Sequence, residues 1–225
     1  MARKGTFITF EGGEGCGKST QVQRLAARLQ KEGYCVDVRR EPGGTEIGDQ
    51  IRHILKFSYK TAPMTAETEL LLFCANRAQL VREVITPILR SESVVICDRY
   101  HDSTTVYQGL ARELDMGVVR TINNFAIGGC IPDITIVIDI DPKIGHERIR
   151  NREREMPDQL GLFNGELFDR MESVSLEFSK RVRQGYLDLA KREPKRVKVI
   201  AGSQSIEAVG KQIWELVRHV LQRSA

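Results

Sequence analysis

The chain has 225 residues, of which 41% are hydrophobic and 28% charged, and its formal net charge is +4. This length and composition are typical of a globular protein with one large α/β domain or two small ones. No run comes near the roughly 18 consecutive apolar residues of a membrane span, and no basic stripe indicates nucleic-acid binding, so we expect neither a membrane nor a nucleic acid as partner.

The start of the chain and its cysteines predict a cytoplasmic protein. Residues 1–5 lead straight into the first apolar run and leave no room for a signal peptide. The five cysteines include no Cys-x-x-Cys pair, and most lie in apolar runs, where a reduced cysteine acts as a small hydrophobe. A reducing compartment is therefore expected.

Short apolar runs alternate with longer helical patterns along the chain. The expected strands are 6–11, 34–39, 94–98, 134–140 and 196–200. The expected helices are 18–32, 46–57, 66–90, 103–112, 117–127, 142–152, 165–191 and 205–222. Several strand runs are continuously apolar, as in parallel strands covered on both faces. The alternation predicts one α/β domain with a doubly wound, parallel five-stranded sheet flanked by helices.

Residues 12–19 match the pattern G-x-x-x-x-G-K-[ST] between a predicted strand and a predicted helix, as that motif requires. Glycines let backbone N–H groups turn inward as a nest for phosphate, and the helix start adds its positive dipole end. Lys18 can neutralise the β- and γ-phosphates, and Ser19 can ligate Mg²⁺. The motif predicts a P-loop NTPase-like fold and a nucleotide site formed by Gly12, Gly13, Glu14, Gly15, Cys16, Gly17, Lys18, Ser19 and Thr20. The alternative is a glycine-rich turn without a ligand.

A Pro-Gly-Gly loop at residues 40–45 follows the second strand. Such loops line the ligand crevice of open α/β sheets, which makes Glu41 and Pro42 candidate substrate contacts. Arg52, on the next helix, would point toward the same region as Arg99. Two arginines that converge on one dianion suit a nucleoside monophosphate.

Phe73 and Arg77 are four residues apart on a very apolar predicted helix. Such a pair lies on one helix face. Phe73 suits either the core or a stacked base, whereas an arginine on an apolar face needs an anionic or carbonyl partner.

The run Val94–Asp98 ends in an acid, as a Walker B strand does. Asp98 is thereby placed beside the phosphate loop, where it could hold Mg²⁺ through water or orient the attacking oxygen. A helix cap is the alternative role for Asp98. Arg99 offers a forked donor for phosphate, although an arginine at a strand end is often only a surface ion pair.

Polar residues at helical spacing follow Arg99 in the sequence. Ser103 pairs with Tyr107, and Thr104 pairs with Gln108, at i,i+4. These groups could read a sugar hydroxyl or the polar edge of a base, or they could form a solvent-facing surface.

Residues 148–165 are rich in arginine and then in turn residues. This composition predicts a mobile lid that brings cations to a phosphate when substrate binds. A solvated helix end followed by a surface loop is equally consistent with the composition.

Segments along nearly the whole chain resemble motifs of the thymidylate kinase family. They are residues 10–20, 40–45, 72–77, 98–109, 131–133 and 203–209. Other P-loop kinases lack the combination of Arg-Glu-Pro-Gly-Gly-Thr with Asp-Arg-Tyr. The resemblance implies a homodimeric enzyme that transfers the γ-phosphate of ATP to dTMP, giving dTDP for dTTP biosynthesis, with Mg²⁺ as cofactor.

The resemblance also implies residue roles. Arg52 and Arg99 would hold the dTMP phosphate, and Phe73 would stack on thymine, whose carbonyl Arg77 would hydrogen-bond. Further contacts to dTMP would come from Glu41, Pro42, Ser103, Thr104, Tyr107 and Gln108.

Glu14 in the phosphate loop resembles the bacterial type of the family, in which the lid supplies the catalytic cation. Arg152 is the first candidate for this cation. Arg148 is the second and is also a candidate contact to ATP. The catalytic set would then be Lys18, Asp98, Arg99 and Arg152, and the metal ligands would be Ser19 and Asp98.

Other functions are also compatible with a P-loop. A nucleotide kinase with a different acceptor is the nearest. A GTPase switch is disfavoured because the chain has no Asn-Lys-x-Asp motif, and an inactive homologue is disfavoured because every phosphate-handling residue is intact. Leu70 and Leu71 could serve either the core or a dimer interface.

Overall fold

The computed structural model describes residues 5–57, 63–155 and 175–224. Its centre is a five-stranded sheet with the order β2-β3-β1-β4-β5. The strands are β1 (Thr6–Glu11), β2 (Val36–Arg40), β3 (Val94–Asp98), β4 (Ile134–Asp139) and β5 (Val197–Ala201). All neighbouring strands are parallel, which confirms the predicted sheet.

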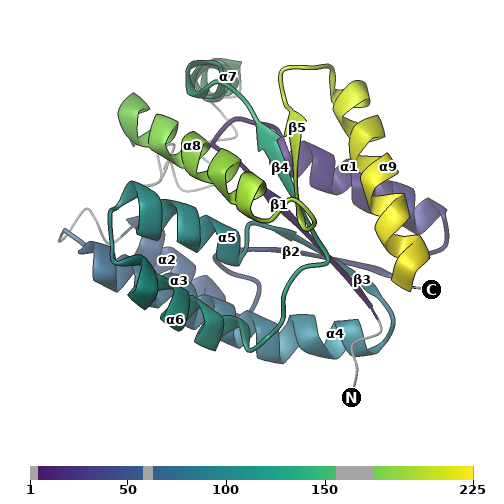
Figure 1. The fold of residues 1–225 in the computed structure, drawn as a ribbon, viewed down its shortest axis with the longest axis horizontal. Helices are drawn as coiled ribbons and strands as arrows, with labels where there is room; N and C mark the ends of the chain where they lie inside the picture. Colours follow the sequence, from purple (N-terminus) through teal and green to yellow (C-terminus); the bar gives the residue numbers. More distant parts are fainter. Residues whose placement is uncertain (1–4, 58–62, 156–174, 225) are drawn as a thin grey trace.

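Helices cover both faces of the sheet (Figure 1). On one face α1 (Lys18–Lys31) and α9 (Ile206–Ser224) pack on apolar residues of β1, β3 and β4. On the other face lies a continuous helical segment made of α3 (Ala66–Leu80), the π-helical η2 (Val81–Ile85) and α4 (Thr86–Arg90). The same face also carries α8 (Leu176–Arg192), which packs on β4 and β5. Helices on both faces make the sheet doubly wound, as predicted.

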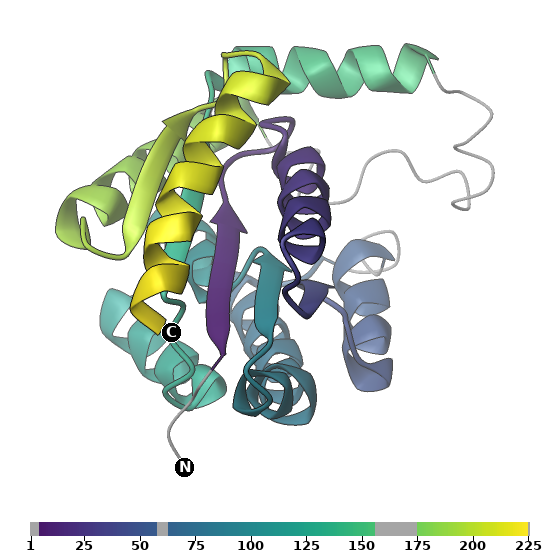
Figure 2. The same cartoon turned by 90° about the vertical axis from the view of Figure 1, so that its right-hand side faces the viewer.

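The remaining helices lie around this core. α2 (Glu46–Phe57) and α6 (Met116–Ile127) pack on opposite sides of α3. A short helix, α5 (His101–Thr104), continues as the π-helical η3 (Thr105–Ala111). α7 (Pro142–Glu155) runs across the top of the molecule in Figure 2. No helix among the described residues is long and apolar enough to cross a membrane.

The register of the sheet brings three strand ends to one level. Phe10 of β1 and Arg40 of β2 both lie opposite Asp98 of β3. The segments that follow these strands therefore begin at the same edge of the sheet, although they are far apart in sequence. This edge is where an open α/β sheet binds its ligands.

Several predicted boundaries differ from the structure. The second strand begins at Val36, because the chain first closes the end of α1 with a hydrogen bond from Tyr34 N–H to the Leu29 carbonyl (3.0 Å). The helix predicted at 165–191 begins only at Leu176, since Ser175 has an extended backbone and caps the helix through Phe178 N–H (3.2 Å). Residues 165–174 lie outside the described part of the chain.

Two predicted helices contain π turns. Pro87 has no N–H to donate to the carbonyl of Glu83, and its ring would crowd that carbonyl, which accounts for the wider turn at Val81–Ile85 in the helix predicted at 66–90. The helix predicted at 103–112 begins at His101 and is π-helical from Thr105 to Ala111. Such bulges are frequent at functional sites.

Candidate active site

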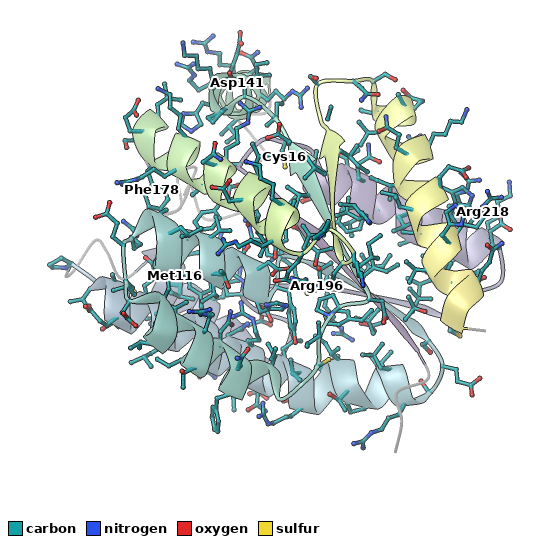
Figure 3. The ribbon with its side chains drawn as sticks, in the orientation of Figure 1. Cys16, Met116, Asp141, Phe178, Arg196 and Arg218 are labelled. Carbon is teal, nitrogen blue, oxygen red and sulfur yellow. The ribbon has the colours of Figure 1, made fainter. Side chains whose placement is uncertain are left out.

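A pocket of about 480 Å³ lies at the carboxyl edge of the sheet. Nearly all the candidate residues line it, namely Glu14, Gly15, Cys16, Gly17, Lys18, Ser19, Thr20, Glu41, Pro42, Arg52, Phe73, Asp98, Arg99, Ser103, Thr104, Tyr107, Gln108 and Arg148. The structure adds Arg40, Lys56 and Ile149. Gly12, Gly13 and Arg77 do not line the pocket. In Figure 3, Cys16 lies toward the same end of the molecule as Asp141, which immediately precedes α7.

The phosphate loop is built around Lys18. Gly17, in the left-handed region (φ 97°), precedes α1 and offers no side-chain cap to its first N–H groups. The Lys18 ammonium donates to the carbonyls of Gly12 (3.1 Å) and Gly13 (2.9 Å). Burial and Arg99 lower the pKa of Lys18, but nearby Cys16, Glu14 and Asp98 outweigh them and raise it overall. A cation thus lies over a loop with N–H donors available for an anion.

Ser19, at the end of the phosphate loop, is linked directly to Asp98 at the end of β3. The Ser19 hydroxyl donates to Asp98 Oδ2 (2.9 Å). A hydroxyl and a carboxylate are hard oxygen ligands, which Mg²⁺ prefers. No cluster of three or more acidic, cysteine or histidine ligands occurs in the described part of the chain. That is consistent with Mg²⁺, which usually keeps water and substrate phosphate as its other ligands.

Arg99 lies between the phosphate loop and the rest of the pocket. Its backbone is left-handed (φ 70°), which is uncommon for a residue with a side chain and is found at functional sites. One edge of its guanidinium pairs with Glu14, and the other donates to Ser103 Oγ (3.2 Å). Its central carbon lies 5.1 Å from the centre of the Tyr107 ring. Burial lowers the pKa of Arg99, but Tyr107 and Glu14 more than compensate, so Arg99 stays a cation.

Arg77 lies behind the wall of the pocket and is only 1% exposed. Its guanidinium makes five hydrogen bonds, two to Glu41 Oε2 and one each to Thr104 Oγ1, Asn123 Oδ1 and a backbone carbonyl. An arginine has five N–H donors, so all are engaged with protein acceptors. The direct contact to a base that the resemblance implies would require one of these acceptors to be exchanged. In this structure Arg77 supports Glu41 and Thr104, which do line the pocket.

The loop after β2 is held by its own contacts. Arg52 donates to the Pro42 carbonyl (2.8 Å), and Asn76 Oδ1 accepts from Gly43 N–H (2.7 Å). Burial raises the pKa of Glu41, whereas the two hydrogen bonds from the Arg77 cation oppose this and favour the carboxylate. Arg52 and Arg99 line the same pocket, as the sequence predicted for a pair that converges on one anion.

The polar residues of α5 and η3 share the pocket although their spacing is not α-helical. The helix widens to π from Thr105 onward, so the two predicted i,i+4 pairs lie on a wider turn than that of an α-helix. Ser103, Thr104, Tyr107 and Gln108 nevertheless all line the pocket. Gln108 Nε2 donates to the buried Glu69 (2.6 Å), a contact that sequence reasoning missed.

Sequence reasoning also missed the buried residues behind the pocket. Glu11, Glu69 and Tyr186 hydrogen-bond pocket side chains from other elements, and Asn123 accepts from Arg77 behind the pocket. Only Glu11 had a recognisable signal, since it ends an apolar strand just as Asp98 does.

α7 contacts the phosphate loop through backbone. A Cβ built on Gly145 would lie 2.4 Å from the Glu14 carbonyl oxygen, so this position needs glycine. Arg148, one turn further, lines the pocket and donates to the Gly202 carbonyl (3.2 Å). Arg152 lies on α7, but its side chain and residues 156–165 of the predicted lid are outside the described part, so its role stays a prediction.

Comparison with known proteins decides the family. The family model described as thymidylate kinase matches residues 10–213. The chain belongs to the thymidylate kinase family. A thymidylate kinase of Kosmotoga olearia is 46% identical over 208 residues, 92% of each chain. One of Chlorobium luteolum is 48% identical over 203 residues, 90% of this chain and 92% of the relative.

A solved thymidylate kinase supports the same assignment. The crystal structure of the enzyme from Ehrlichia chaffeensis matches with a TM-score of 0.73 and 31% identity, over 95% of this chain and 98% of that one. The P-loop NTPase-like fold is thereby confirmed. Membership of the thymidylate kinase family also confirms the predicted enzyme class: the chain is a nucleoside monophosphate kinase that phosphorylates dTMP to dTDP.

Proposed function

We propose that the pocket joins ATP and dTMP end to end and that Arg99 bridges them. The observation that carries this proposal is the position of Arg99, whose guanidinium touches the phosphate loop through Glu14 and the acceptor helix through Ser103. A phosphoryl group passing between two bound nucleotides must cross this space. A cation fixed there would neutralise the oxygens that gain charge during transfer.

The donor side would be the phosphate loop. ATP would place its β- and γ-phosphates on the loop N–H groups and Lys18, whose present carbonyl partners are weaker acceptors than phosphate. Ser19 and Asp98 would hold Mg²⁺, which would offset the charge of the phosphates. Arg148, which lines the pocket beside the loop, would contact the same nucleotide.

The acceptor side would be the wall formed by α2, α3 and η3. Phe73 would stack on thymine, and Tyr107 would lie under the deoxyribose. Arg52 would share the dTMP phosphate with Arg99, while Glu41, Pro42, Ser103, Thr104 and Gln108 would complete the wall. Arg77 would orient Glu41 and Thr104 from behind.

The chemistry needs little beyond alignment and charge neutralisation. A phosphate oxygen of dTMP is already a nucleophile and would attack the γ-phosphorus in line, so no strong general base is required. Lys18 and Arg99 would stabilise the transferring group together with a lid arginine, Arg152 first and Arg148 second. The lid at residues 148–165 would be the mobile part of a single kinase domain.

The test of this function combines acceptor choice with one variant. ADP release is measured with ATP-Mg and dTMP, dUMP, UMP, dCMP, AMP or GMP, and dTMP is expected to give by far the highest kcat/KM. Arg99→Ala is expected to lower kcat with dTMP by about 10³-fold or more, the scale of a transferring arginine in related systems. Binding of a fluorescent ATP analogue should change only a few-fold.

Arg181→Ala serves as the control, because this arginine is on the exposed side of α8 and pairs with Glu113. It should leave turnover unchanged. Unchanged dTMP affinity and turnover in Arg99→Ala would contradict the bridging role, and a preference for another monophosphate would contradict the acceptor.

We also propose an oligomeric state and a cellular compartment for the protein. Exposed apolar side chains occur on α2 (Ile47 and Ile54), α3 (Leu71) and α6 (Val118 and Phe125), three helices that pack side by side. We assign this surface to a homodimer interface. A cytoplasmic location suits the substrates and the five free thiols.

A further inference from the structure

Glu11 is an acid buried completely at the end of β1. Its Oε1 accepts from two backbone N–H groups at the start of α5, at 2.9 and 3.2 Å. Its Oε2 accepts from the hydroxyls of Ser103 (2.6 Å) and Tyr186 (2.7 Å). Four donors from two separate segments thus converge on one carboxylate that no solvent reaches.

The two hydroxyls are oriented by this carboxylate. A hydroxyl has one proton and two acceptor lone pairs. The two hydroxyl oxygens also lie 3.0 Å apart, but when both give their proton to Glu11, each keeps its lone pairs as acceptors. Arg99 Nη1 lies 3.2 Å from Ser103 Oγ and 3.5 Å from the Tyr186 hydroxyl.

The other edge of Arg99 faces a different partner. Its Nη2 pairs with Glu14, which belongs to the phosphate loop. An incoming phosphate competes with Glu14 for this edge, because both are anions. The Nη1 edge instead faces two neutral hydroxyls, which are themselves anchored on the buried Glu11 carboxylate.

We propose that Tyr186 and Glu11 are positioning residues for Arg99: with Ser103 they hold the Nη1 edge of its guanidinium while the Nη2 edge exchanges Glu14 for phosphate. This inference rests on the role of Arg99 under the proposed function. It connects α8, which carries Tyr186, to the acceptor phosphate through Arg99. Neither Tyr186 nor Glu11 touches the reacting atoms, so they act through Arg99.

The test is a double-mutant cycle on dTMP affinity, measured by titration calorimetry. Tyr186→Phe removes one acceptor of Arg99 without removing the ring. It is expected to weaken dTMP binding about 10-fold, the scale of one hydrogen bond to a charged group, and to leave binding of the ATP analogue unchanged. In the Arg99→Ala background the same substitution should change dTMP affinity less than about 2-fold, because coupled residues are not additive.

Tyr100→Phe is the matched control. The Tyr100 ring is as buried as that of Tyr186, but its hydroxyl donates to the Cys130 carbonyl (2.9 Å). It should lower the melting temperature about as much as Tyr186→Phe and leave dTMP affinity unchanged. A similar loss of affinity in Tyr100→Phe would overturn the inference, because it would indicate general loosening.

The double-mutant cycle distinguishes a failure of the positioning role from a failure of the proposed function of Arg99. An equal effect of Tyr186→Phe with and without Arg99 would overturn the positioning role alone. An Arg99→Ala variant with normal dTMP affinity and turnover would overturn the proposed function and, with it, the positioning role.

Discussion

Arg77 is a cation enclosed by protein, and its neighbours explain how it is tolerated. A buried charge is expensive unless it is paired and hydrogen-bonded. Glu41 supplies the opposite charge, and Thr104, Asn123 and a carbonyl satisfy the remaining donors. Because each of these acceptors has a fixed place, the group acts as a rigid support behind the pocket.

His101 is a buried residue whose charge the fold disfavours. Its Nε2 is buried without a hydrogen-bond partner, and its Nδ1 lies 3.5 Å from Asp102. Burial lowers the pKa of His101 to about 4, helped by Arg196 and Arg77 and opposed by Asp102. The unfolded chain, with a histidine pKa of about 6.5, therefore binds this proton more tightly than the folded protein does.

This difference predicts a loss of stability in acid. The contribution of His101 is fully present above about pH 6.5 and is lost as the pH falls toward 4, because protonation favours the unfolded chain. Between pH 7 and pH 5 the loss from His101 alone is expected to be about 2 kcal/mol. Urea denaturation at both pH values measures it.

His101→Gln, which cannot titrate, should reduce the difference between the two pH values by that amount. His219→Gln on the exposed side of α9 is the control and should leave the difference as in the parent. An unchanged difference in His101→Gln would show that His101 is not the group responsible.

At the scale of elements, the contact between α7 and the phosphate loop is made by backbone. A Cβ on Gly15 would lie 2.2 Å from the Gly145 carbonyl oxygen, and one on Gly145 would lie 2.4 Å from the Glu14 carbonyl oxygen. Backbone cannot move aside as a flexible side chain can. α7 and the phosphate loop can therefore approach this closely only because Gly15 and Gly145 have no side chain.

Gly145→Ala tests this contact. In a helix interior alanine is normally better than glycine by up to about 1 kcal/mol. Here we expect the opposite: a destabilisation of about 1–3 kcal/mol from overpacking and a several-fold weaker binding of ATP, because the loop must shift. Chemical denaturation and titration with the fluorescent analogue measure the two effects.

Gly210→Ala in α9 is the matched substitution, since its Cβ would meet the end of the Gln21 side chain at 3.2 Å. It should be neutral or slightly stabilising. A Gly145→Ala variant as stable as Gly210→Ala, with normal ATP binding, would contradict the close contact.

The elements that could be predicted are those that a local sequence pattern identifies. The phosphate loop is recognisable because its glycines, Lys18 and Ser19 occur at fixed spacing between a strand and a helix. Strands such as Val94–Asp98 stand out as continuous apolar runs. The π turn at Thr105–Ala111 could not be predicted, because no periodicity distinguishes it from an α-helix over so few residues.

The supporting residues of the site escaped prediction for a different reason. Tyr186 meets Glu11 across 175 positions of sequence, and Asn123 meets Arg77 across 46. Spacing rules describe neighbours on one element only. It was predictable that Arg77 needed a polar partner. That Glu41, Thr104, Asn123 and the Tyr100 carbonyl together occupy all five of its donors depends on how three helices and a loop pack.

At the scale of the whole molecule, exposed apolar side chains occur on the neighbouring helices α2, α3 and α6. Phe125 on α6 is 77% exposed, and Leu71 on α3 is 54% exposed. α3 packs between α2 and α6, so its outer side lies in the middle of this surface (Figure 1). An apolar patch of this kind marks an interaction site.

Leu71→Glu tests the proposed dimer. A charge in the centre of an apolar interface must be desolvated without a partner, which opposes association. We expect the chain to sediment as a dimer and the variant to sediment as a monomer at the same concentration. Ile206→Glu, an equally exposed apolar position on α9, should leave the sedimentation coefficient unchanged. A monomeric parent chain would contradict the proposal.

The ends of β1, β2 and β3 lie at the same level, and this alignment restricts which insertions and deletions the chain can accept. Inserting one residue into β3 would move Asp98 and Arg99 about 3.3 Å along the strand and turn each to the opposite face of the sheet. The donor side and the acceptor side of the pocket would then both lose their alignment with Asp98 and Arg99. Changes in length are accordingly tolerable only in the connections beyond this edge, and a new acceptor would have to be accommodated there.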